Sequence, residues 1–240
     1  SASLRFLAFA SRRLEMTNSR VPWRPLRLAF QQPVRIGIMG STFFFRDTHI
    51  LEHIALRLLP EIAGRSITKI WDAGCAHGPE PYTLAMILAE NLDEAVFQNL
   101  TIDATDYDPG GQFGAIVKNG IYPGEELDRI PRDILDKYFE RSMDRDGCYQ
   151  VKAFLRNRIQ YRTHDLLALN PIGGGYSLIL CKNVLLHFQY EQRIQVITMF
   201  HAALAPGGLF AVEQTQKMPA EIAHLFRQVV PDAQLFKKIG

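Results

Sequence analysis

The chain has 240 residues, of which 47% are hydrophobic and 22% charged, so it fits one globular domain with a sizeable core and not a disordered chain. Its formal net charge of +2 gives no bulk attraction to nucleic acid, and we expect no nucleic-acid partner. Its 3 cysteines are far apart, which argues against a disulfide framework and a metal site. No run approaches the roughly 20 apolar residues of a membrane span, and the apolar N-terminal patch precedes its arginines, the reverse of a secretory signal. We therefore expect a cytoplasmic protein.

The first 40 residues are expected to form a basic arm or short helical lead-in, separate from the domain at 41–240. Residues 1–35 contain seven arginines against one acid, Glu15. Such an arm could meet an acidic protein surface, nucleic acid or anionic lipid, or it could be a solvated lead-in packed on the domain.

After this arm, strands alternate with helices. Apolar runs predict strands at 66–74, 100–106, 176–184 and 209–214. Helical periodicity predicts helices at 80–92, 109–120, 131–142 and 191–204. Between them, the stretch 148–166 predicts two strands with a turn near Arg156–Asn157, which we interpret as a small antiparallel β insertion at about 148–163. The alternation predicts an α/β fold, with a mostly parallel central sheet and helices on both faces.

Polar residues follow the expected strands, at the edge where such sheets bind ligands. The stretch "WDAGCAHGPE" places Gly74 and Gly78 between a strand and a helix, where the backbone can approach a ligand closely. The next strand ends in "DATDYD", whose Asp106 can accept hydrogen bonds from ribose hydroxyls, whereas Asp108 suits a helix cap. The loop lacks the G-x-G-x-x-G pattern of dinucleotide sites, which favours S-adenosylmethionine, a cofactor with one adenosine and no pyrophosphate.

Two other stretches combine apolar and polar residues in an unusual order. In "STFFFRDTHI", residues 41–50, three phenylalanines run directly into Arg46. Either the charge marks the point where the chain meets solvent, or the apolar wall holds Arg46 in a dry place. In "CKNVLLHF", Asn183 ends an apolar strand and is costly to bury without a bonding partner. With His187 four residues later, this stretch is either part of a site or a satisfied core asparagine with a surface histidine.

Taken together, these stretches resemble the CheR family of S-adenosylmethionine-dependent methyltransferases, which esterify glutamate side chains of chemotaxis receptors. The similarity covers about residues 40–216 and rests on "STFFFRD", "AGCAHGPEPYTLAM", "ATDYD", "GIY…LDKYF", "CKNVLLHF" and "LAPGGLFAVEQ". It implies a Rossmann-like class I methyltransferase fold, S-adenosyl-L-methionine as cofactor with S-adenosyl-L-homocysteine as product, and a receptor-like protein glutamate as acceptor.

The resemblance also implies roles for single residues. It places cofactor contacts on Thr42, Arg46, Glu80, Asp106, Asp165, Leu166, Lys182 and Asn183, to which the glycine loop adds Gly74 and Cys75. In the family the arginine of "FFR" reaches the active site near the reacting methyl, so Arg46 is expected to bind the acceptor carboxylate in a fork geometry. A carboxylate is already a competent nucleophile, so Arg46 would be a positioning group.

The chain departs from the family pattern in four places. Only about 40 residues precede Thr42, where the family has a helical domain that meets the receptor. Gly40 replaces an asparagine, and Asp165 replaces the first residue of "N-L-L". His187 replaces the tyrosine of "N-V-L-I-Y-F", and imidazole can serve as a general base near neutral pH.

These observations leave three hypotheses. The first is a CheR-like protein-glutamate O-methyltransferase. The second is a methyltransferase for a small molecule or another hydroxyl or amine acceptor, with His187 as catalytic base. The third is a catalytically weak sensor that binds the cofactor and acts through protein contacts. Arg46 and His187 are the candidate catalytic residues.

Overall fold

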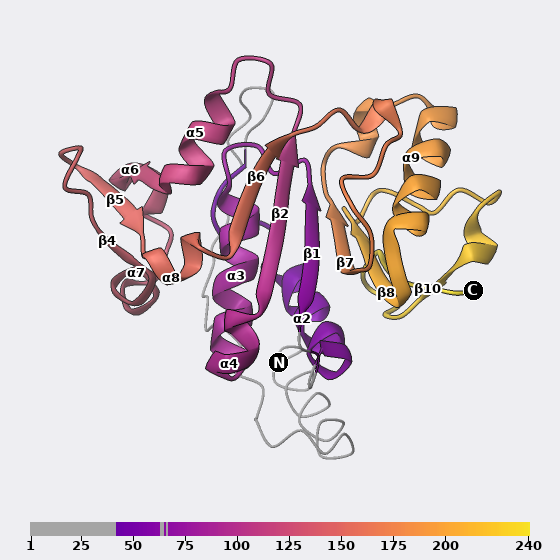
Figure 1. The fold of residues 1–240 in the computed structure, drawn as a ribbon, viewed down its shortest axis with the longest axis horizontal. Helices are drawn as coiled ribbons and strands as arrows, with labels where there is room; N and C mark the ends of the chain where they lie inside the picture. Colours follow the sequence, from indigo (N-terminus) through magenta and orange to yellow (C-terminus); the bar gives the residue numbers. More distant parts are fainter. Residues whose placement is uncertain (1–41, 63–64, 66) are drawn as a thin grey trace.

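The computed structural model describes residues 42–62, 65 and 67–240, so the basic arm expected at 1–40 lies outside the described residues. A seven-stranded sheet forms the centre, in the order β6-β2-β1-β7-β8-β10-β9 (Figure 1). Its strands are β1 (Thr68–Ala73), β2 (Leu100–Asp106), β6 (Ile159–Thr163), β7 (Tyr176–Cys181), β8 (Leu204–Val212), β9 (Phe226–Gln228) and β10 (Leu235–Lys238). The first five in chain order are parallel, and β10 is antiparallel to both of its neighbours.

Helices cover both faces of this sheet, as the alternation predicts. The helices are α2 (Thr48–Ile62), α3 (Pro79–Asn91), α4 (Glu94–Gln98), α5 (Gln112–Asn119), α6 (Gly124–Leu127), α7 (Arg132–Tyr138), α8 (Ala153–Arg156) and α9 (Tyr190–Ala203). Buried side chains of α2 and α3 pack with Ile70 and Leu180 on one face. Those of α9 pack with Trp71 and Ile179 on the other. The two core clusters follow the alternation of side chains along a strand.

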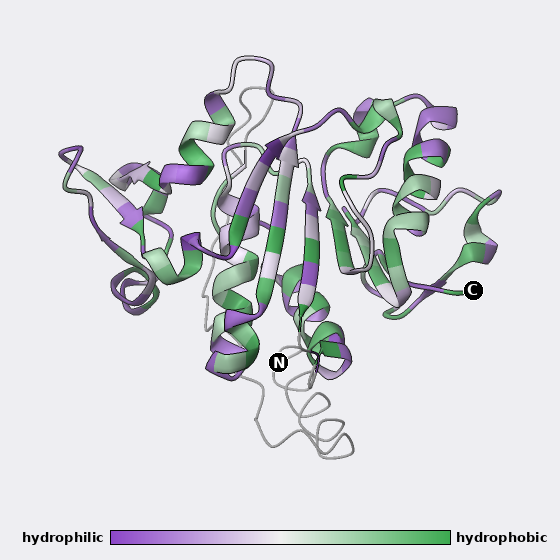
Figure 2. Ribbon diagram, viewed as in Figure 1, coloured by the Kyte–Doolittle hydropathy of each residue, from purple (hydrophilic) through white to green (hydrophobic). Residues whose placement is uncertain are grey.

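The burial of each strand follows its composition. All residues of β7 are buried, as its continuous apolar run predicts for a central strand of a parallel sheet. The edge strand β6 carries more hydrophilic residues than β7 (Figure 2). The strand order reverses between β1 and β7, since the chain builds outward from β1 to β2 and β6 on one side and from β7 to β8 on the other. Ligands bind at the carboxyl ends of the strands beside such a switch point.

The β insertion differs from the expected one. The structure has a three-stranded antiparallel sheet made of β3 (Ile121–Pro123), β4 (Phe139–Arg141) and β5 (Cys148–Val151), in the order β3-β5-β4. The second strand expected within 148–163 is β6, which pairs parallel with β2 in the central sheet. The short helix α8 separates β5 from β6, so the two strands form no hairpin. The expected boundaries of the insertion are therefore wrong, because the residue pattern of a strand does not specify which strand it pairs with.

Two residues define the ends of α5, and the first acts as the sequence predicts. Asp108 caps α5, since its carboxylate accepts hydrogen bonds from the backbone N–H of Gln112 and of Gly114, each at 3.0 Å. Gly120 ends that helix in a left-handed conformation.

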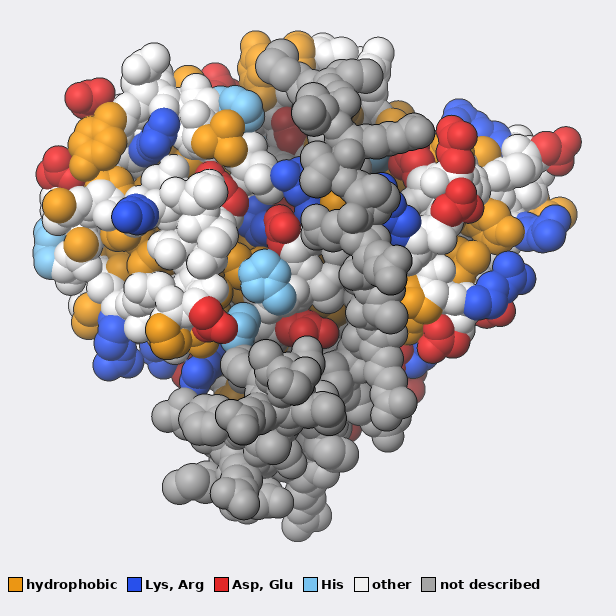
Figure 3. Space-filling model, turned by 180° about the vertical axis from the view of Figure 1, so that it is seen from behind, with side chains coloured by type: hydrophobic (Ala, Val, Ile, Leu, Met, Phe, Trp, Pro, Cys, Tyr) orange, Lys and Arg blue, Asp and Glu red, His pale blue; other side chains and the backbone are white. Residues whose placement is uncertain are grey.

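None of the described helices is both long enough and apolar enough to cross a membrane. Basic and acidic side chains are interspersed over the face seen from behind (Figure 3).

Candidate functional site

The phenylalanine run forms a tight turn that carries Arg46 into the molecule. Phe44 is buried edge-on against Tyr122, with ring centroids 4.9 Å apart. The buried Phe45 has a left-handed backbone with φ of 60°, and its N–H donates to Thr83 Oγ1 at 3.1 Å. Phe43 is 39% exposed, and the Arg46 guanidinium lies over its ring at 5.9 Å. The apolar wall therefore fixes the turn from which Arg46 projects.

The glycine loop between β1 and α3 is pinned to the end of β2. The backbone N–H groups of Gly74 and Cys75 both donate to the carbonyl of Thr105, at 2.7 and 3.0 Å. The N–H of Ala76 donates to Asp106 Oδ2 at 2.7 Å. Burial raises the pKa of Asp106 above its ordinary value, and the Ala76 N–H opposes this shift. The loop thus holds one oxygen of the carboxylate that the sequence assigns to a ribose.

A hollow of about 300 Å³ opens beside this loop, at the carboxyl ends of β1, β2 and β6. It brings together predicted cofactor residues from three separate segments. Its lining consists of Gly74, Thr105, Asp106, Tyr107, His164, Asp165, Leu166, Leu167, Val184 and Phe188. A Cβ on Gly74 would lie 2.1 Å from Val184 Cγ2, so the backbone of the loop is in close contact with this wall. A lining that combines apolar side chains with two carboxylates suits the base and hydroxyls of a nucleoside.

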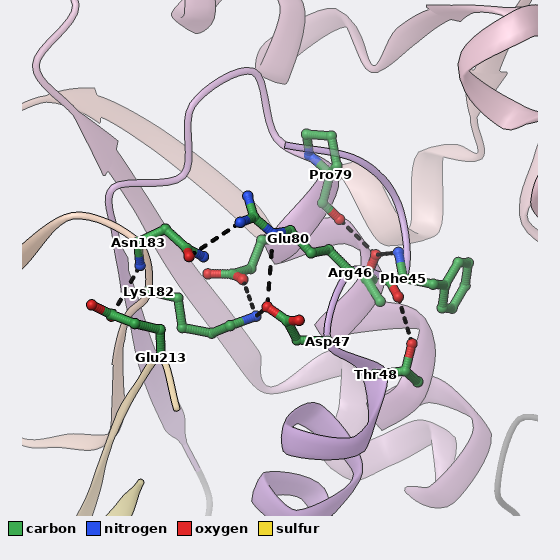
Figure 4. A network of polar contacts seen from close by, with 10 residues as sticks. Phe45, Arg46, Asp47, Thr48, Pro79, Glu80, Lys182, Asn183 and Glu213 are labelled. Atoms are coloured by element: carbon green, nitrogen blue, oxygen red, sulfur yellow. Dashed lines mark hydrogen bonds and ion pairs between the residues drawn. The ribbon is translucent and has the colours of Figure 1, made fainter. Parts of the chain in front are cut away.

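A network of charged and polar side chains surrounds Lys182 (Figure 4). Lys182 has a side-chain exposure of 0%, and its Nζ lies 2.8 Å from Glu80 Oε2 and 3.5 Å from Asp47 Oδ2. Burial by itself lowers the pKa of Lys182, but the carboxylates of Glu80, Asp47 and Asp72 outweigh it and the pKa is raised. Lys182 is therefore a fixed positive charge, and Glu80 is its direct partner.

Arg46 joins the same network from the phenylalanine turn. Its Nη2 donates to Asn183 Oδ1 at 3.1 Å, and its Nε lies 3.7 Å from Asp47 Oδ2. The backbone N–H of Asn183 donates to Glu213 Oε2 at 3.0 Å. The turns 46–47 and 182–183 are thus joined twice, by Arg46 to Asn183 and by Lys182 to Asp47.

A second hollow, of about 180 Å³, opens onto this network. Its lining comes from the turn 46–47 with the start of α2 and from the ends of β7 and β8. It consists of Arg46, Asp47, His49, Ile50, Lys182, Asn183, Glu213, Gln214 and Thr215. Two cations with an amide and carboxylates suit a zwitterion or an acidic side chain.

The sequence reasoning missed three acids of this site. Asp72 on β1 is fully buried, and neither of its carboxylate oxygens has a hydrogen-bond partner among the described residues. Burial raises the pKa of Asp72 well above its usual range, and Glu80 adds to this shift. Asp47 and Glu213 contact Lys182 and Asn183 directly. The one available signal was Asp72 itself, an acid inside an apolar strand.

Some predicted residues lie elsewhere. In the described part of the chain, neither hollow is lined by Thr42, Cys75, Glu80 or His187. Cys75 is buried, and burial raises the pKa of its thiol well above the ordinary value. His187 is exposed in the 3₁₀ turn Leu185–His187. The roles assigned to these residues stay predictions, as do those assigned to the residues that line the two hollows.

Comparison with known proteins gives one family. The family model described as CheR methyltransferase, SAM binding domain, matches residues 40–234. Chemotaxis protein methyltransferase 1 of Pseudomonas aeruginosa is 32% identical over 191 residues, which cover 75% of this chain and 68% of that protein. The probable chemotaxis protein methyltransferase of Rhizobium etli is 27% identical over 193 residues, covering 78% of this chain and 71% of that protein.

A solved structure supports the fold. The rRNA methyltransferase aviRa of Streptomyces viridochromogenes has a TM-score of 0.50 and 14% sequence identity, and the alignment covers 84% of this chain and 87% of that chain. At this identity the likeness concerns the fold alone. The likeness is consistent with the α/β fold described above.

Proposed function

Because the chain belongs to the CheR family of S-adenosylmethionine-dependent methyltransferases, we propose that it methylates a glutamate side chain of a receptor-like protein acceptor. The product would be a carboxyl methyl ester. The observation that carries the proposal is the placement of Arg46, whose guanidinium is fixed at the second hollow by Asn183. A guanidinium in that place can bind a carboxylate through two parallel hydrogen bonds.

The first hollow fits the nucleoside of S-adenosylmethionine. Asp106 would bind the ribose hydroxyls, while Leu166 and Val184 would pack on the base. The charged groups around Lys182 and Glu80 would hold the amino-acid end. When bound, the cofactor supplies a methyl group on a positively charged sulfur, and the sulfur keeps the electron pair as the acceptor oxygen takes the methyl.

The chain's own contribution to the reaction is positioning. A carboxylate is deprotonated at neutral pH and needs no base, so the nucleophile has only to be oriented and kept at contact distance. Arg46 has a side-chain exposure of 31%, so its guanidinium is partly shielded from water and still reachable from the second hollow. The exposed position of His187 supports no competing base mechanism.

The names of the relatives support a protein acceptor. Both are called chemotaxis protein methyltransferases, whereas nothing in the lining of the second hollow favours a particular small molecule. The second hollow lies at the surface ends of β7 and β8, where an extended acceptor segment can present one side chain.

The test is methyl transfer from labelled S-adenosylmethionine into a lysate of the source cells, followed by mild base. An ester releases its label as volatile methanol, whereas methylated nitrogen or ether oxygen retains it. Retained label would contradict the proposal. We further expect Arg46→Ala to lower the rate of ester formation about a hundredfold or more, and cofactor affinity by calorimetry to fall much less. Arg46→Lys keeps the positive charge but cannot form two parallel hydrogen bonds, so its rate of ester formation should lie between those of the wild type and Arg46→Ala.

A further inference from the structure

Glu213 lies at the end of β8, and no function so far accounts for it. Glu213 is only 6% exposed, although an ionised carboxylate is costly to bury. Oε2 accepts the hydrogen bond from the backbone N–H of Asn183 at 3.0 Å. Oε1 is buried without a hydrogen-bond partner among the described residues. The burial of an acid that makes a single hydrogen bond calls for an explanation. The partner in that bond, the backbone of Asn183, indicates one.

Asn183 has a backbone conformation that requires support. Its φ of 59° lies in the left-handed region, which non-glycine residues adopt rarely and which asparagine tolerates best. In this conformation its N–H points to Glu213 while its side-chain oxygen receives Arg46 Nη2 at 3.1 Å. If the N–H loses its acceptor, the residue is free to return to a commoner conformation, and the side-chain oxygen then moves away from Arg46.

We propose that Glu213 is a positioning residue for methyl transfer, which acts by holding Asn183 in the conformation that orients the Arg46 guanidinium. The order of contacts is Glu213 Oε2 to Asn183 N, then Asn183 Oδ1 to Arg46 Nη2. The carboxylate makes a charge-assisted hydrogen bond, stronger than a neutral acceptor would make. The inference rests on the proposed function insofar as Arg46 orients the acceptor carboxylate.

The contact with Lys182 does not replace this support. Lys182, the residue before Asn183, is held by Glu80 and Asp47, and both contacts are made by the lysine side chain. These contacts fix the position of the turn, but the backbone N–H of Asn183 is bound by Glu213. Glu213 therefore has a role separate from that of Glu80 and Asp47, and mutations can distinguish the two roles.

The experiment compares Glu213→Ala and Glu213→Gln, each in the wild-type chain and in the Arg46→Ala chain. Glu61→Ala is the matched control, since it removes a carboxylate paired with Lys237 at the surface. For each variant we measure the rate of base-labile transfer into the lysate at saturating S-adenosylmethionine and the cofactor affinity by calorimetry. The ¹⁵N resonances of the Arg46 side chain report on its immobilisation without any turnover.

We expect Glu213→Ala to lower the rate at least tenfold, to change cofactor affinity less than about threefold, and to remove the protection of the Arg46 side-chain protons. Glu213→Gln retains an acceptor for the Asn183 N–H and should restore most of the loss. In the Arg46→Ala chain, Glu213→Ala should have little further effect, because the positioned group is already absent.

Two results would overturn the inference. One is an Arg46 resonance that is unchanged in Glu213→Ala, which would show that the guanidinium is held independently. The other is an equal loss of rate from Glu213→Ala with and without Arg46, which would indicate general damage. A wild-type chain that forms no base-labile product would instead contradict the proposed function, and the resonances would still decide whether Glu213 holds Arg46.

Discussion

Replacing Lys182 by methionine tests the energetics of the site most directly. The lysine Nζ lies 2.8 Å from Glu80 Oε2 and 3.5 Å from Asp47 Oδ2, with a side-chain exposure of 0%. At an effective dielectric constant of about 20, the contact with Glu80 corresponds to a Coulomb energy of about 6 kcal/mol. Desolvation of both charges offsets most of this, so the intact pair adds little net stability.

Removing only the lysine has a much larger effect, because it leaves the Glu80 carboxylate, whose side chain is only 10% exposed, without its compensating charge. Breaking one partner of a buried pair costs about 3 to 5 kcal/mol. For a domain of this size, that corresponds to a decrease in Tm of about 6 to 20 °C. The control is Lys237→Met, because its pair with Glu61 has a similar distance of 2.7 Å, but the side chains of Lys237 and Glu61 are 28% and 41% exposed. That variant should change stability by less than about 1 kcal/mol.

The assay is thermal unfolding at pH 7.5, followed by circular dichroism. The variants are Lys182→Met, Glu80→Gln and the double variant. We expect the double variant to be more stable than Lys182→Met, since Glu80→Gln removes the charge that the first substitution leaves unpaired. A loss below about 1 kcal/mol for Lys182→Met, or additive effects of the two substitutions, would refute this account of the network.

Two further predictions concern stability. Burial raises the pKa of Glu52 to about 7, so its folded state binds a proton more tightly than the unfolded chain does, and stability should decrease as the pH rises from about 4.5 through 7. Glu52→Gln should therefore raise the stability at pH 8 by about 1 to 2 kcal/mol, after allowance for solvent screening, and change it little at pH 4, as Tm measurements at both pH values would show. Gly78→Ala should lower stability by about 2 to 3 kcal/mol, because φ is 103° and the new Cβ would lie 2.8 Å from the Tyr122 hydroxyl oxygen. Gly147→Ala has a φ of 70° but nothing within 4 Å, so chemical denaturation should show only the smaller backbone strain; equal losses would contradict the steric argument.

The extent of the central strands was predictable because a strand buried on both faces has a continuous run of apolar residues in the sequence. The run 100–106 matches β2 at both ends, and the apolar run from 176 covers β7. Strand ends at a switch point also have a known relation to ligands, which explains why the sequence alone could single out Asp106. Asp165 and Leu166 came from the family resemblance, and the structure places both beside Asp106 at the first hollow.

The partners of the charged residues were not predictable in the same way. Glu80 was expected to contact the cofactor, and the structure shows that it accepts a hydrogen bond from Lys182, 102 residues further along the chain. Nothing in the local sequence of either residue specifies that contact. The same holds for β6, whose alternating pattern fits a strand but does not distinguish pairing with β5 from pairing with β2.

The sequence by itself determined the class of fold and the family, because hydrophobic periodicity and turn residues act over a few positions and motifs retain their order. Tertiary structure alone decided which charges meet. The turns 46–47 and 182–183 each have a residue with positive φ, and only their approach across the site allows Arg46 to reach Asn183 and Lys182 to reach Asp47. Burial then determines the charge states, since the pKa of Asp72 and that of Lys182 depend on groups that folding brings together.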